Sequence, residues 1–130
     1  MIAGAKHSLQ QGTRRMPSRP IDMMHLTKQA LGDAGLEGEI LRAYSETIGT
    51  HFAKLERSTN VDDLLHHLHT LKGASIGVGA WALAEHAHVM ANELKTGEAV
   101  NPERVDDIHM AVEEVQAFIS QRLAFADLDA

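Results

Sequence analysis

Apolar residues recur at steps of three and four along the chain from Ile21 onward. This spacing is the period of an amphipathic α-helix, and no alternating segment long enough for a strand interrupts it. The pattern therefore predicts an all-α protein. Asp22 can cap a short first helix that carries Met23, Leu26, Ala30 and Leu31 and that Gly32 terminates.

The next two expected helices are long. The first runs over about 36–57, and its apolar stripe consists of Leu36, Ile40, Leu41, Tyr44, Ile48, Phe52 and Leu55. Asn60 can cap the following helix, which is expected to continue to Val78. Gly77 and Gly79 predict a break after it.

Two more helices complete the chain. One is expected from about Trp81 to a stop at Gly97, and the last starts at Asn101 and Pro102. The last helix has a bundle-type seam of Val105, Ile108, Val112, Val115 and Ile119. Four long amphipathic helices with short connectors favour an antiparallel four-helix bundle with an additional short N-terminal helix. We expect this domain over 21–125 and a C-terminal tail over 126–130.

Residues 1–20 lack apolar periodicity and carry Lys6, Arg14, Arg15 and Arg19 without any acid. We expect them to form a flexible basic leader outside the domain. Removing these four positive charges from the formal net charge of −6 leaves about −10 on the rest. An acidic body repels phosphate backbones, so nucleic acid is not an expected partner.

Length and composition limit the remaining possibilities. A chain of 130 residues with 44% apolar content can form one domain with a core. The absence of cysteine excludes disulfides, thiolate metal sites and cysteine nucleophiles. No apolar run is long enough to cross a bilayer or to form the centre of a signal peptide. We expect a cytoplasmic monomer without membrane contact.

The third helix carries the candidate chemistry. On a helical wheel with Leu64 at zero, His69 lies at roughly 140°, outside the apolar stripe. Gly73 follows one turn later, although glycine in a helix costs roughly 0.5–1 kcal/mol relative to alanine. Lys72 lies next to His69 on the surface and can neutralise an anion. These residues predict an exposed nucleophilic nitrogen with a cation beside it and open space for a partner.

A neutral imidazole nitrogen is a competent nucleophile near neutral pH, and the phosphoramidate it forms remains a good phosphoryl donor. We therefore expect a phosphocarrier at His69, with the acceptor carboxylate and any metal ion supplied by the partner. No glycine-rich nucleotide-binding motif is present, so a kinase is not expected. No cofactor is expected either.

The sequence HTLKGAS at residues 69–75 resembles the signature of histidine-containing phosphotransfer (HPt) domains. The resemblance covers about residues 21–123 and includes Val78, Gly79 and Leu83. It implies a four-helix bundle in which His69 relays a phosphoryl group between receiver-domain aspartates, from a hybrid sensor kinase to a response regulator. In this two-component phosphorelay, Lys72 would assist electrostatically and Gly73 would give access.

The sequence departs from the family pattern at one position. Family members often have a polar residue 22 positions after the histidine, where this chain has Ala91. His88, nearly one turn earlier, is a candidate replacement that would support His69. The resemblance also implies a modest, transient partner surface around His69, for which we expect contributions from His66, Ile76, Gly77 and Ala80.

Two other functions fit parts of the sequence. His66 and His69 are spaced i, i+3, and Glu85-x-x-His88 resembles half of the pattern of carboxylate-bridged dimetal bundles. Such bundles need two such pairs with inward glutamates, so we expect no metal. A noncatalytic adaptor that binds a protein through an apolar groove is the other alternative, and it predicts no dependence on His69.

Overall fold

The structure is a computed structural model that describes residues 19–129. Within this part of the chain there are five helices and no strand, which confirms the all-α prediction. The helices are α2 (Met23–Gln29), α3 (Ala34–Arg57), α4 (Val61–Val78), α5 (Trp81–Lys95) and α6 (Pro102–Asp129). The predicted basic leader lies outside the described residues except for Arg19 and Pro20.

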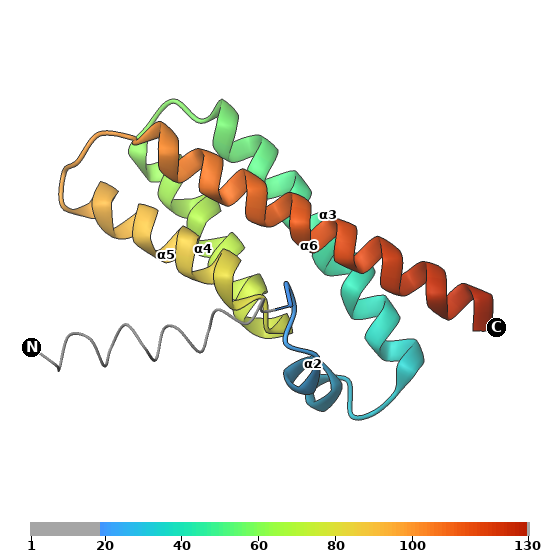
Figure 1. Ribbon diagram of the computed structural model, residues 1–130. Helices are drawn as coiled ribbons and strands as arrows, with labels where there is room; N and C mark the ends of the chain where they lie inside the picture. Colours follow the sequence, from blue (N-terminus) through green and yellow to red (C-terminus); the bar gives the residue numbers. More distant parts are fainter. Residues whose placement is uncertain (1–18, 130) are drawn as a thin grey trace, which may run out of the picture.

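The four long helices form the predicted antiparallel bundle (Figure 1). α4 packs between α3 and α5, and α6 closes the ring by packing against both α3 and α5. The short α2 contacts α4. Figure 1 shows that α3 and α6 extend past the turn between α4 and α5, and that α2 lies beside this turn.

Side-chain caps fix where the helices begin. Asp22 accepts a hydrogen bond from the His25 amide, and Asn60 accepts one from the Asp63 amide, as predicted. α3 begins at Ala34, two residues before the predicted start, because Asp33 caps it by accepting a hydrogen bond from the Leu36 amide.

One predicted helix end was wrong. α2 ends at Gln29 rather than at Leu31, because Leu31 and Gly32 both adopt positive φ angles, of 54° and 75°. At the other end of the chain, α6 continues to Asp129, through the residues predicted as a tail. Residues 120–129 contain neither glycine nor proline, so nothing in the local sequence stops the helix.

The core contains one buried polar contact between helices. Ser75 on α4 is fully buried, and its Oγ lies 2.7 Å from the hydroxyl of Tyr44 on α3. Burial raises the pKa of Tyr44 to about 12. Since this contact and Leu71 hold one side of α4 in the core, the opposite side of α4, which carries His69, faces outward.

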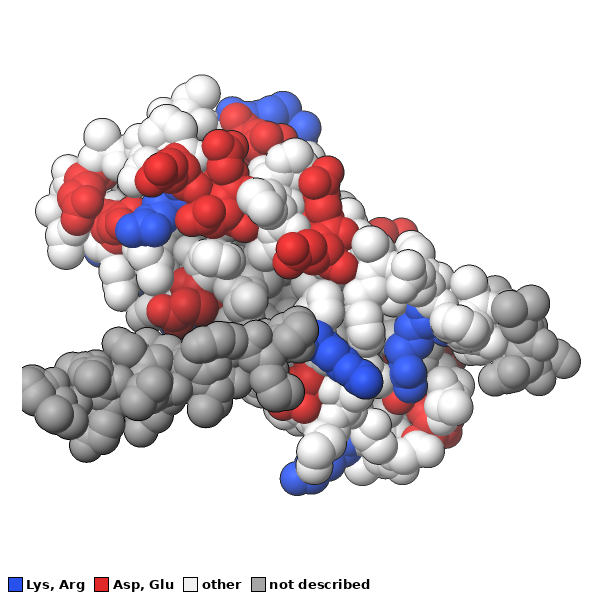
Figure 2. Space-filling model, in the orientation of Figure 1, with Lys and Arg blue, Asp and Glu red and all other residues white. Residues whose placement is uncertain are grey.

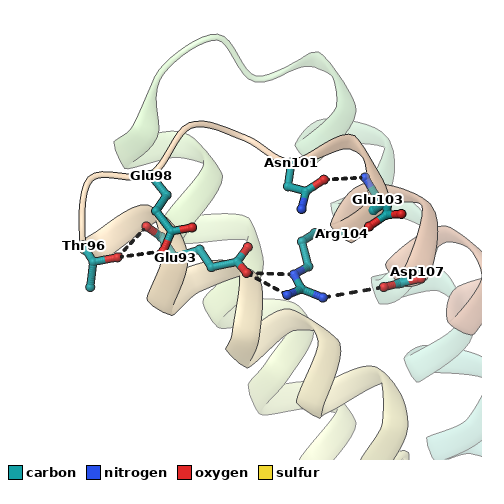
Figure 3. A network of polar contacts seen from close by, with 7 residues as sticks. All are labelled: Glu93, Thr96, Glu98, Asn101, Glu103, Arg104 and Asp107. Carbon is teal, nitrogen blue, oxygen red and sulfur yellow. Dashed lines mark hydrogen bonds and ion pairs between the residues drawn. The ribbon is translucent and has the colours of Figure 1, made fainter.

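Acidic side chains gather over α5 and α6 on the face shown in Figure 2. There the guanidinium of Arg104 binds Glu93 through Nη2 at 2.8 Å and through Nε at 2.9 Å, as Figure 3 shows. Asn101 caps α6 by accepting a hydrogen bond from the Glu103 amide at 2.9 Å. Because Arg104 and Glu93 belong to different helices, their ion pair fixes the start of α6 against α5.

Candidate functional site

His69 is exposed on α4 and lines a small recess between α4 and α5. The recess has a volume of about 90 Å³. Its lining residues are Leu65, Leu68, His69 and Lys72 from α4, and His88, Ala91 and Lys95 from α5. Pockets for drug-sized ligands usually measure about 300–1,000 Å³. This recess can therefore receive a group of phosphoryl size and is too small for a nucleotide.

Lys72 is held by a residue of the neighbouring helix. Its Nζ lies 3.0 Å from Nδ1 of His88. An ammonium group can only donate, so Nδ1 of His88 accepts the hydrogen bond from Lys72. His88 thus lines the predicted site, and its hydrogen bond there is with Lys72 rather than with His69.

The recess contains a second lysine that the sequence interpretation missed. Lys95 is on the last turn of α5 and lines the recess together with Lys72. Ala91, one turn before Lys95, also lines the recess and contributes no polar group. The spacing of four residues between Ala91 and Lys95, on one helix face, was a signal that could have identified this lysine.

Gly73 and Gly77 leave open space on the exposed side of α4. A Cβ atom added to either glycine would meet nothing within 4 Å. His66 and Ile76 are exposed on the same helix. Four of the residues predicted to surround His69 are therefore open to solvent, namely His66, Gly73, Ile76 and Gly77.

The predicted contribution of Ala80 to this surface was wrong, since Ala80 is fully buried. Gly79, with a φ of 86°, ends α4 and turns the chain, so Ala80 does not continue the exposed side of that helix. Ala80 then becomes the N-cap residue of α5 and points into the core. Trp81, which follows it, is 46% exposed and lines a wider groove with Lys72, Ile76 and His88.

A family model described as Hpt domain matches residues 39–118, which is more than half of the chain. The chain belongs to the Hpt domain family. Searches of curated proteins and of solved structures found no match. The matched segment contains all of α4 and α5 and therefore the whole recess around His69.

Membership of the Hpt family gives the general function of the chain. Hpt domains are phosphocarrier modules of two-component signalling rather than kinases, and they interact with receiver domains in phosphorelays. No described helix of this Hpt domain combines the length and apolar character needed to cross a membrane.

A cluster of three histidines lies where α4 packs against α3, whereas the recess lies between α4 and α5. Nδ1 of His51 on α3 lies 3.0 Å from Nδ1 of His67 on α4, and the ring centroid of His66 lies 5.0 Å from that of His67. Burial lowers the pKa of both His51 and His67, and the neighbouring histidines lower it further. Within residues 19–129, no set of three or more histidine or carboxylate side chains is arranged to hold a metal ion.

Proposed function

We propose that His69 is the phosphoacceptor of this Hpt domain, and that the chain relays a phosphoryl group from the receiver domain of a hybrid sensor kinase to that of a response regulator. The observation that carries the proposal is the recess in which an exposed imidazole lies beside two lysines. The open space at Gly73 supports it, because a receiver domain must bring its aspartate against the ring.

The chemistry follows from these groups. A lone pair on a ring nitrogen of His69 attacks the phosphorus of an aspartyl phosphate, with Nε2 as the proposed nucleophile. The P–N bond forms while the P–O bond to the receiver carboxylate breaks, and the carboxylate leaves with the electron pair. The reverse steps then deliver the phosphoryl group to the next receiver. The receiver supplies the metal ion and most of the catalysis.

Lys72 and Lys95 have an electrostatic role in this proposal. The three equatorial oxygens of a phosphoryl group carry negative charge during transfer, and two ammonium groups beside the recess reduce the cost of bringing it there. His88 acts as a positioning residue, because its hydrogen bond holds the ammonium of Lys72 at the rim of the recess. In this proposal His88 supports the site through Lys72.

The proposed docking surface consists of His66, Ile76, Gly77 and Trp81, which surround the exposed side of α4 and the start of α5. Ile76 is 43% exposed and Trp81 is 46% exposed, so the surface has an apolar part close to Lys72. Receiver domains must bind in turn and then leave, which requires a modest interface. The cytoplasmic location and the monomeric state remain predictions.

The test is transfer of labelled phosphoryl groups from a panel of phosphorylated receiver domains to the full chain. The wild type should acquire an acid-labile label, and His69→Gln should acquire none. His86→Gln is the matched control, because His86 lies on α5 and does not line the recess. If His69→Gln is labelled as fast as the wild type, the phosphoacceptor assignment is wrong and the adaptor alternative, which needs no His69, gains support.

A further inference from the structure

The contact between His51 and His67 differs from every other histidine contact in the described part of the chain, because two ring nitrogens face each other directly. The two Nδ1 atoms are 3.0 Å apart. Both side chains are half-buried, and they come from different helices, 16 residues apart in the sequence. The antiparallel packing of α3 and α4 therefore builds this pair, and the pair exists only in the folded chain.

The spacing of the two nitrogens is that of a chelate. Imidazole nitrogens lie about 2.0–2.1 Å from Zn²⁺, so two ligands at a tetrahedral angle are roughly 3.3 Å apart. Two ligands at a right angle around a square-planar ion such as Cu²⁺ are roughly 2.9 Å apart. The observed 3.0 Å lies between these values. A metal ion bound by both nitrogens lies off the line that joins them, so chelation turns each ring by roughly 35–45° from its present hydrogen-bonding direction.

The surroundings favour the neutral rings that a metal requires. Burial and the neighbouring histidines disfavour protonation of His51 and His67, so each ring can turn a lone pair toward a metal ion. Asp63, one turn before His67, contributes negative charge, whereas Lys54 contributes positive charge and weakens the attraction. Partial burial also limits the rotamers of both rings, which reduces the entropy lost on binding.

We propose that His51 and His67 form a bidentate site for a divalent late transition-metal ion such as Zn²⁺ or Cu²⁺. Water or a small ligand from solution completes the coordination, because no third side chain of the described residues converges on the pair. The site is accordingly weaker than a structural zinc site with four protein ligands. It lies on the α3 side of α4, apart from the recess around His69, and does not depend on the phosphocarrier function.

The experiment is a thermal unfolding series of the full chain with increasing Zn²⁺. A ligand that binds only the folded state stabilises it in a concentration-dependent way, so the wild-type Tm should rise with Zn²⁺ and then saturate. The rise should be lost in both His51→Gln and His67→Gln. It should persist in His86→Gln, which removes one histidine of α5 outside the cluster. Each variant is compared with itself in the absence of metal, so a change in basal stability does not affect the result.

A second measurement uses only the wild type, so it tests the site even if a variant does not fold. The electron paramagnetic resonance spectrum of the wild type with one equivalent of Cu²⁺ should show coupling to two imidazole nitrogens. The proposal is overturned if Zn²⁺ leaves the wild-type Tm unchanged, or if the rise survives in His51→Gln. Loss of the rise in His67→Gln alone would also overturn it, because that result assigns the metal to neighbouring histidines of α4. The contact between His51 and His67 would then be only an N–H···N hydrogen bond.

Discussion

The ammonium of Lys72 lies 3.0 Å from Nδ1 of His88, so a residue of α5 determines where the cation next to His69 is held. We expect Lys72→Met to slow phosphoryl transfer from a receiver domain about tenfold, which corresponds to about 1.4 kcal/mol of transition-state stabilisation. His88→Leu should slow transfer by a smaller factor, because Lys72 keeps its charge and loses only its position.

The double variant Lys72→Met/His88→Leu tests whether His88 acts only by positioning Lys72 or has an independent role. If His88 acts only through Lys72, the variant with both substitutions should transfer at the rate of Lys72→Met alone. Rapid-quench measurements of the three variants give the coupling. Effects that multiply in the double variant would contradict the positioning role of His88.

Substitutions at Gly73 distinguish an effect on folding stability from an effect on the access of a receiver domain to His69. It lies inside α4 with open space around it, so Gly73→Ala should raise the free energy of unfolding by roughly 0.5–1 kcal/mol. Gly73→Leu should also fold, but its side chain should obstruct a receiver domain at His69. We expect transfer from the receiver to fall while phosphorylation by a small donor such as phosphoramidate is retained. Equal loss with both donors would show damage to the histidine itself.

Gly79 and Gly97 form a matched pair for testing how α2 is held. Both have left-handed φ angles, of 86° and 89°, so alanine should cost roughly 1–2 kcal/mol at either position. A Cβ atom at Gly79 would also lie 3.0 Å from Cβ of Asp22 and 3.1 Å from its carbonyl oxygen, whereas at Gly97 it meets nothing within 4 Å. Urea unfolding should therefore show a larger loss for Gly79→Ala. Equal losses would mean that α2 does not pack closely against this turn.

The hydrogen bond between Tyr44 and Ser75 predicts a coupled loss of stability. Tyr44→Phe should cost about 1–3 kcal/mol, because it leaves the buried hydroxyl of Ser75 without its partner. Ser75→Ala should cost a similar amount for the same reason. The double variant should cost less than the two single losses together, since neither hydroxyl is then left alone. Additive losses in urea unfolding would argue against this hydrogen bond.

Tyr44 also predicts a loss of stability in alkali. Burial raises its pKa to about 12 in the folded protein, compared with the ordinary tyrosine pKa of 10.0. In the folded state the neutral phenol is favoured, so the stability from this group is intact below pH 10.0 and is lost as the pH rises to about 12. Tyr44→Phe should lack this component of the alkaline loss. An identical pH dependence in both proteins would contradict the raised pKa.

Much of the site could be predicted from the sequence because it lies on one helix. His69, Lys72 and Gly73 follow one another within a single turn or so, and helical geometry alone places them on a shared surface. The exposure of His69 and the open space at Gly73 agree with that prediction. The prediction for Ala80 was wrong because α4 ends before Gly79, so the exposed side of the helix does not extend to Ala80.

The sequence by itself determined the helices, their caps at Asp22 and Asn60, and the apolar stripes that make a bundle, since helical periodicity and capping are local properties. Only the tertiary structure decided which residues meet across the helices. Three contacts depend on how neighbouring antiparallel helices are aligned along their axes. They are the position of Lys95 at the recess, the hydrogen bond from Lys72 to His88, and the contact between His51 and His67. That alignment is set by the packing of the whole core, which no local pattern specifies.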